Sequence, residues 1–173
     1  MANRPTLSDP QLKHPRYWLT WLLLGLAWLT TQLPQRGRLS AGTLVGIIGY
    51  RVAKRRRNIT RINLQLCFPE LNEAELKQRV KQVFRSTGIG LIETATVWLT
   101  NPNRYRHQVK IHGLEHLQTS KNPQQGILLV GMHQATLDFA GAVVATYKPF
   151  DVMYKANKNT LIETVMTRGR SRN

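Results

Sequence analysis

The stretch that decides the predicted fold is GILLVGMHQATLDFAG, residues 126–141. Its first part, residues 127–132, is a short continuous apolar run, which is typical of a buried parallel strand. The apolar pattern over residues 139–147 is typical of a helix. A strand followed by a helix indicates an α/β unit, and open α/β sheets bind their ligands at the carboxyl ends of such strands.

Two side chains of this stretch can carry chemistry. His133 directly follows the apolar run, and Asp138 lies five residues further on. A turn between them can bring the carboxylate of Asp138 to one imidazole nitrogen, which leaves the other nitrogen free to act as a general base. A hydroxyl of a bound substrate would then supply the nucleophile. The alternative is a helix-capping aspartate beside a histidine without a catalytic role, and the spacing alone leaves both interpretations open.

Strands and helices alternate in the predicted soluble part of the chain, from residue 58 onward. Asn72 is a candidate helix N-cap with Glu73 and Glu75 in the first turn. The helix that it starts should end near residue 87, because Gly88 and Gly90 are expected to break or kink it. The remaining predicted elements are a helix over 91–99, a strand over 109–112, a helix over 114–119, a turn over 121–126, a strand over 151–154 and a helix over 160–167. This alternation predicts an α/β fold.

Residues 17–33, YWLTWLLLGLAWLTTQL, contain no charged side chain. This length approaches a hydrocarbon core of about 30 Å only if the polar flanks snorkel, so the run is predicted to be a short membrane span or a deep interfacial anchor. A buried core helix and a cleaved signal peptide are the alternatives. Most of the nearby basic residues follow the run, which places the rest of the chain in the cytoplasm if the run spans. We therefore predict a membrane anchor and basic juxtamembrane segment over residues 1–57, and a second domain over residues 58–173.

Charge points to anionic partners. The chain has 173 residues, with 25 Lys+Arg against 9 Asp+Glu and a net charge of +16. Membrane headgroups, phosphorylated substrates, acidic proteins and nucleic acid all fit this charge. The run of four basic residues at 54–57 fits anionic lipid next to an apolar segment, or alternatively a nucleic-acid patch. The single cysteine, Cys67, excludes a disulfide scaffold and favours a reducing compartment.

Five blocks in order resemble one family. They are RINLQLCFPEL at residues 61–71, GIGLIETATVWL at 88–99, VKIHGLEHL at 109–117, HQATLD at 133–138 and VMYKANKNTLIETVMTRGR at 152–170. The block HQATLD resembles the His-x-x-x-x-Asp/Glu signature of the lysophospholipid and glycerolipid acyltransferase superfamily. Together the blocks resemble the lauroyl- and myristoyl-type acyltransferases of lipid A biosynthesis, over about residues 10–173.

The resemblance implies a partial α/β sheet like that of glycerolipid acyltransferases, behind an N-terminal membrane-anchor helix. It implies an enzyme on the cytoplasmic side of the inner membrane that transfers an acyl chain from acyl carrier protein to a hydroxyl of a lipid A precursor. His133 matches the general base and Asp138 its orienting carboxylate, although many lipid A members have Glu at the position of Asp138. Lys155, Arg168 and Arg170 match basic positions and are expected to bind the phosphates of the acceptor. A solvated basic face is the alternative for these three.

No metal or cofactor is expected, since Gly113 interrupts any helix that His112 and His116 could share. Membrane lipids are expected partners and nucleic acid is not, because recognition motifs for it are absent. Similar enzymes run on for about another domain's length, so the chain is expected to be an N-terminal part with little activity by itself. The alternative functions are a non-catalytic basic module that binds membrane surfaces or nucleic acid, and an inactive fragment of the enzyme.

Overall fold

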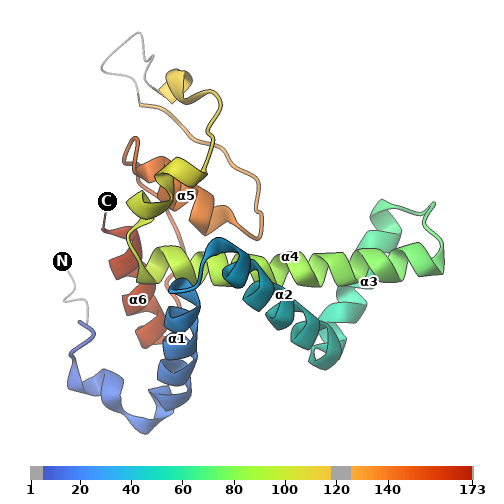
Figure 1. The fold of residues 1–173 in the computed structure, drawn as a ribbon, viewed down its shortest axis with the longest axis horizontal. Coiled ribbons are helices and arrows are strands. Elements are labelled where there is room, and N and C mark those ends of the chain that lie inside the picture. The colour runs from blue at the N-terminus through green and yellow to red at the C-terminus, as the bar shows by residue number, and fades with distance from the viewer. Residues whose placement is uncertain (1–5, 118–125, 173) are drawn as a thin grey trace.

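The computed structural model describes residues 6–117 and 126–172. Within these residues every regular element is a helix. The α-helices are α1 (Trp18–Thr31), α2 (Gln35–Val52), α3 (Lys54–Cys67), α4 (Glu73–Leu99), α5 (Leu137–Ala145) and α6 (Thr160–Arg170), and the 3₁₀ helices are η1 (Pro10–Lys13), η2 (Pro15–Tyr17), η3 (Pro102–Gln108) and η4 (Leu114–Leu117). Figure 1 shows α4 as the long central helix, and all the other α-helices contact it.

The start of α4 confirms the predicted N-cap. The side chain of Asn72 accepts hydrogen bonds from the backbone N–H groups of Ala74 and Glu75, each at 3.0 Å. The carboxylate of Glu75 accepts in turn from the backbone N–H of Asn72 at 3.0 Å, which completes a capping box. These local bonds satisfy backbone donors that the first helical turn leaves free.

The predicted break between residues 87 and 91 is wrong, because α4 continues through Gly88 and Gly90. Both glycines are buried where another segment crosses the helix closely. A Cβ on Gly88 would lie 2.8 Å from the Cα of Gly46 in α2, a distance that real Cβ atoms essentially never show. A glycine inside a helix lowers its stability by about 1 kcal/mol relative to alanine. Here the glycine allows α2 to pack closely on α4.

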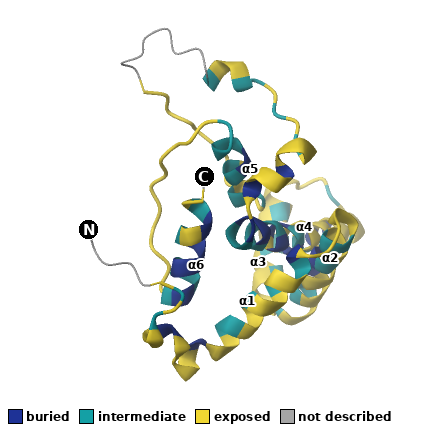
Figure 2. Ribbon diagram, turned by 60° about the vertical axis from the view of Figure 1, so that its left-hand side comes forward, coloured by how far each residue is buried: buried dark blue, intermediate teal, exposed yellow. Residues whose placement is uncertain are grey.

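A small core joins the two ends of the chain. Leu12 and Tyr17, from the N-terminal 3₁₀ segments, are buried with Leu161 and Val165 of α6. The indole of Trp21 adds a hydrogen bond of 2.8 Å to the carbonyl of Leu12. Figure 2 shows the buried positions of α6 in dark blue. The N-terminal segment is thus part of the packing that positions α6. The division into domains 1–57 and 58–173 stays a prediction.

The α/β prediction is wrong for the part of the chain that the structure describes. Residues 126–134 and 149–157 have no regular secondary structure, and no strand forms within residues 6–117 and 126–172. Leu128 and Val130 are 87% and 88% exposed, so no described segment covers this face of the apolar run. A strand needs a neighbour for its ladder of hydrogen bonds, and an apolar composition cannot supply one. The predicted turn over residues 121–126 lies almost wholly outside the described residues, as do the last two residues of the predicted helix at 114–119.

The predicted N-terminal membrane-anchor helix is also wrong. The uncharged run forms α1, whose 14 residues reach about 21 Å, against about 30 Å of hydrocarbon. Among the described residues, no helix combines the length and the apolar character that crossing a bilayer requires. The helix formed by this run is short because the run ends next to Pro34. This proline lies directly before the first residue of α2 and interrupts the helical path. Trp21 and Leu24 of α1 pack against the small core.

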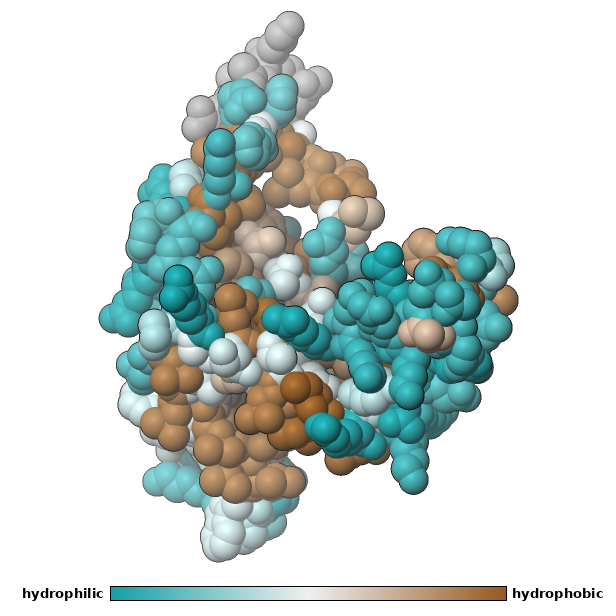
Figure 3. Space-filling model, turned by 45° about the vertical axis from the view of Figure 1, so that its right-hand side comes forward, coloured by the Kyte–Doolittle hydropathy of each residue, from teal (hydrophilic) through white to brown (hydrophobic). Residues whose placement is uncertain are grey.

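The outer side of α1 is nevertheless strongly apolar. Its exposed large side chains are Trp18, Leu19, Leu22, Leu23, Leu26, Trp28 and Leu29, and α2 adds Leu44, Ile47, Ile48 and Val52. Figure 3 shows apolar side chains, in brown, gathered over the lower part of one face of the molecule. Patches of this kind mark interaction surfaces on soluble and membrane-associated proteins.

Candidate active site

The structure brings together two of the predicted site residues, Asp138 and Arg170. Asp138 lies in the first turn of α5 and Arg170 in the last turn of α6, 32 residues apart. The guanidinium Nη2 of Arg170 donates to Oδ1 of Asp138 at 2.5 Å, and both side chains are about 30% exposed. A short charge-assisted hydrogen bond in partial burial holds a carboxylate in a defined orientation.

Arg170 is held from a second side by the segment before α6. Its guanidinium carbon lies 5.1 Å from the ring centre of Tyr154. The hydroxyl of Tyr154 donates to Glu163 of α6 at 2.7 Å. The other carboxylate oxygen of Glu163 accepts from the backbone N–H of Asn157 at 2.7 Å, so the segment is bonded to α6 at two points. Tyr154 and Glu163 were not predicted as site residues, because only their contacts give them a role.

The two other predicted anion-binding residues lie near this pair but are exposed. Lys155 follows Tyr154 in the segment before α6, and Arg168 is on α6. Residues two apart on a helix do not share a face. Arg168 therefore points away from Asp138 while Arg170 contacts it. The roles of Lys155, Arg168 and Arg170 in binding an acceptor stay predictions.

His133 is exposed at the end of the segment that leads into α5. Within the part of the chain that the structure describes, no hydrogen bond joins His133 to Asp138, whose carboxylate is bonded to Arg170 instead. A turn follows His133, in which the N–H of Leu137 donates to the carbonyl of Gln134 at 3.2 Å. Catalytic hydrogen bonds are often long or unformed without substrate. The base role of His133 and the orienting role of Asp138 stay predictions.

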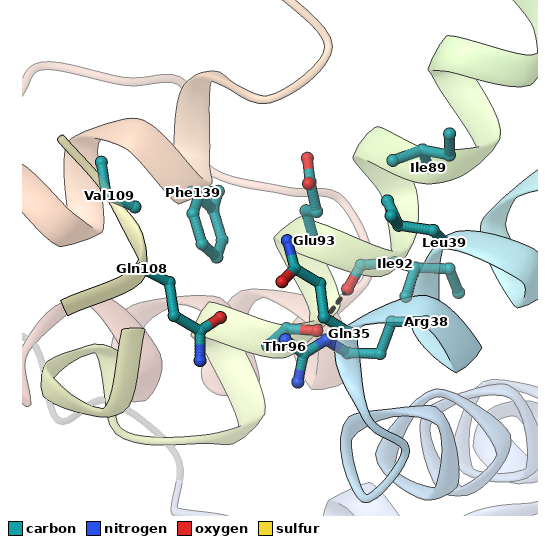
Figure 4. Close-up of a pocket in the computed structure, with 10 residues that line it drawn as sticks. All are labelled: Gln35, Arg38, Leu39, Ile89, Ile92, Glu93, Thr96, Gln108, Val109 and Phe139. Carbon is teal, nitrogen blue, oxygen red and sulfur yellow. Dashed lines mark hydrogen bonds between the residues drawn. The ribbon is translucent and has the colours of Figure 1, made fainter. Parts of the chain in front are cut away.

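A small cavity lies beside this region and contains a carboxyl group that sequence reasoning missed. The cavity has a volume of about 80 Å³, and α2, α4, η3 and α5 contribute to its walls. Figure 4 shows its lining: Gln35, Arg38, Leu39, Ile89, Ile92, Glu93, Thr96, Gln108, Val109 and Phe139. Oε2 of Glu93 is inaccessible to solvent and has no hydrogen-bond partner among the described residues. In the sequence, the signal for this carboxyl group is a single acidic residue within the apolar stretch LIETATVWL.

Burial raises the pKa of Glu93, and the positive charge of Arg38 opposes that rise. A carboxyl whose pKa is higher in the folded state contributes stability below its unfolded pKa and loses it as pH rises through the folded pKa. We expect Glu93→Gln to raise the Tm at pH 7 by a few degrees and to leave it unchanged near pH 4. Thermal unfolding at both pH values measures this, with the exposed Glu70→Gln as the control. A lower Tm at pH 7 would contradict the assignment.

Comparison with known proteins identifies the family. Residues 6–173 match the family described as bacterial lipid A biosynthesis acyltransferase. The chain is 40% identical over 172 residues to the lipid A biosynthesis lauroyltransferase of Escherichia coli K12, covering 99% of this chain and 56% of that protein. It is 38% identical over 159 residues to the palmitoleoyltransferase of the same strain, covering 92% and 52%.

A third relative is more distant. The lipid A biosynthesis acyltransferase of Haemophilus influenzae is 32% identical over 166 residues, covering 95% of this chain and 53% of that protein. No solved structure matches the chain. The chain spans about half the length of the curated relatives that it matches. The family match covers nearly all of it, and the chain therefore belongs to the bacterial lipid A biosynthesis acyltransferase family.

Proposed function

We propose that the protein transfers a fatty acyl chain from acyl carrier protein to a hydroxyl of a lipid A precursor. His133 removes the proton of the acceptor hydroxyl as the oxygen attacks the thioester carbonyl. The new ester bond forms as the carbon–sulfur bond breaks, and the sulfur leaves with the bonding electrons and takes the proton back from His133 as the free thiol of the carrier. Asp138 supports the positive charge that His133 acquires. No metal or cofactor takes part in this scheme.

The observation that supports this proposal most is the contact between Asp138 and Arg170. It joins the His-x-x-x-x-Asp motif at residues 133–138 to the basic end of α6, so the segment of the proposed base contacts the segment of the proposed phosphate-binding arginine. Arg170 has further N–H groups that Asp138 does not occupy, since a guanidinium carries five donors. Arg170 can therefore orient the carboxylate of Asp138 with one N–H group and still face an anionic acceptor with the others.

The donor and acceptor are tested directly by mass spectrometry. The full-length protein is incubated with a lipid A precursor and a labelled acyl group on either acyl carrier protein or coenzyme A. We expect the acceptor to gain one ester-linked chain, and to gain it much faster from the carrier protein. Equal rates would reject the carrier as the specific donor, and absence of transfer from both would reject the proposed function.

Arg168 provides a test of the acceptor site. Because the Arg168 side chain is exposed, Arg168→Ala should not change the fold. Loss of a charge-assisted hydrogen bond to phosphate costs about 1.5–3 kcal/mol, which corresponds to a rise of about tenfold or more in the acceptor KM. The kcat at saturation should change little. Arg79→Ala, an exposed arginine on α4, is the matched control, and equal KM values for both variants would reduce Arg168 to a solvated residue.

We further propose that the protein works at the cytoplasmic side of the inner membrane, in contact with membrane lipids. The exposed apolar side chains of α1 and α2 and the basic residues 54–57 at the start of α3 support this location. Apolar insertion resists salt, whereas purely electrostatic binding is screened. We expect the protein to sediment with anionic vesicles and to stay bound in 1 M salt. Complete release of the protein from the vesicles in 1 M salt would contradict apolar insertion and show that binding is purely electrostatic.

A further inference from the structure

Two close glycine contacts flank the pair of Asp138 and Arg170, and both are made on α4. A Cβ on Gly90 would lie 2.8 Å from the carbonyl carbon and 2.9 Å from the Cβ of Ala135, three residues before Asp138. A Cβ on Gly169, the neighbour of Arg170, would lie 2.5 Å from the Cα of Trp98. Both glycines are buried. In each case the nearest crowding atoms belong to backbone, which cannot turn aside as a flexible side chain can.

The spacing of these contacts is set by one continuous helix. Gly90 and Trp98 are eight residues apart on α4, which corresponds to about 12 Å along its axis. At one contact the turn that follows His133 rests on the helix. At the other contact α6 rests on the helix next to Arg170, and Figure 1 shows α5 and α6 near the same end of α4. The Asp138–Arg170 hydrogen bond of 2.5 Å then joins these two segments directly to each other.

We propose that Gly90 and Gly169 are positioning residues of the active site. Through their backbone contacts, α4 sets where the His133–Asp138 segment and Arg170 lie relative to each other. This inference rests on the proposed function for its effect on catalysis. The geometric part concerns only the Asp138–Arg170 pair, and it can be measured without any chemical reaction.

The expected effect follows from the size of the displacement. A methyl group at either glycine must move the facing backbone outward, because contacts under 3.0 Å are not tolerated. Displacing reacting groups by about 1 Å can cost about 100-fold in rate. We expect Gly90→Ala to lower kcat about 10- to 100-fold per folded molecule, with the acceptor KM changed less than about twofold. Gly169→Ala should lower kcat similarly and also raise the acceptor KM, because it displaces the neighbouring Arg170, which faces the acceptor in the proposed function.

Two other glycines provide matched controls. Gly88→Ala crowds the backbone of α2 on the same helix, so it destabilises the protein without touching the site. Gly141→Ala lies in α5, the helix of Asp138, where the added atom meets only the ring of Phe150 at an ordinary 3.7 Å. If packing alone matters, Gly88→Ala should resemble Gly90→Ala. If positioning matters, the two should differ at equal losses of stability.

The readout that does not need activity is the NMR signal of the Arg170 guanidinium in the 173-residue chain, assigned by its loss in Arg170→Lys. We expect Gly90→Ala and Gly169→Ala to shift this signal toward its position in Asp138→Asn, and both controls to leave it in place. An unchanged signal in folded Gly90→Ala and Gly169→Ala, or an equal shift in Gly88→Ala, would overturn the proposal. Should Gly90→Ala fail to fold, Ala135→Gly loosens the same contact without adding an atom. An unchanged Arg170 signal in Ala135→Gly would then overturn the role of Gly90.

Activity measurements distinguish failure of the proposed function from failure of the positioning role. If His133→Ala transfers acyl chains at the parental rate, the proposed function fails, while the Arg170 signal still decides whether α4 positions the pair. If His133→Ala is inactive and Gly90→Ala is fully active per folded molecule, the proposed function stands and the positioning role is rejected.

Discussion

Replacing His133 by alanine is expected to reduce acyl transfer by about 10²–10⁴-fold, the usual contribution of a positioned general base. A hydroxyl is a poor nucleophile until its proton is removed during attack, and the variant has no group to accept it. The structure also predicts that the substitution does not disturb folding, because His133 is exposed and has no hydrogen bond to Asp138 within the described residues. The substitution should therefore leave the unfolding midpoint unchanged, so that lost activity cannot be attributed to unfolding.

The measurement is the initial rate of acyl transfer by the full-length protein, alongside a denaturant titration. His112→Ala, an exposed histidine outside the motif, is the control and should keep the parental rate. Asp138→Asn should lose much of the rate and also some stability, since it removes the charge that pairs with Arg170. Asp138→Glu should keep part of the rate, because it keeps the charge. Parental activity in His133→Ala would end the assignment of His133 as the base.

Replacing Gly46 by leucine is expected to abolish the folded state. Gly46 is buried where α2 crosses α4, and a Cβ there would lie 2.7 Å from the Cα of Arg85 and 2.9 Å from the carbonyl carbon of Phe84. Overpacking of this kind costs typically about 1–3 kcal/mol for small additions and more for large ones. Whole domains are stable by only about 5–15 kcal/mol. A side chain of four heavy atoms cannot enter without separating the two helices.

Gly46→Ala gives the graded version of the same test. Helix propensity favours the alanine by about 1 kcal/mol, whereas the backbone contact opposes it by about 1–3 kcal/mol, so the net change should be destabilising. Gly25→Ala is the matched control, because Gly25 is in α1 with nothing within 4 Å of the added atom, and it should be neutral or stabilising. Urea unfolding midpoints at constant m measure both. A midpoint for Gly46→Ala above that of the parent would contradict the close contact.

The candidate site was predictable only in part. His133, Asp138 and Arg170 stand in short blocks whose residue types already indicate chemistry, so the sequence could nominate them. Glu93 and Tyr154 could not be nominated, because their roles depend on segments far away in the chain. Glu93 matters because distant segments, with Leu39 of α2 and Phe139 of α5 among them, line the cavity around it, and Tyr154 matters through the guanidinium that it faces. Sequence patterns do not reveal such contacts between distant segments.

By itself, the sequence determined the family and those helices whose signals are local. Asn72 and Glu75 are three residues apart, so the capping box that starts α4 is decided within one turn. Asn159 caps α6 in a similar way, by accepting from the N–H groups of Leu161 and Ile162. Such signals need no partner elsewhere in the molecule, and the prediction of an N-cap at Asn72 from one of them is confirmed.

Tertiary structure alone decided the rest. Gly88 and Gly90 have the composition of a helix end, but they lie inside α4 because α2 and the turn after His133 approach there. Residues 127–132 have the composition of a buried strand, but no described segment pairs with them. The residue types of a segment determine which surfaces it can bury and which hydrogen bonds it can form. Whether it does so depends on a second segment, whose position is set by the packing of the whole chain.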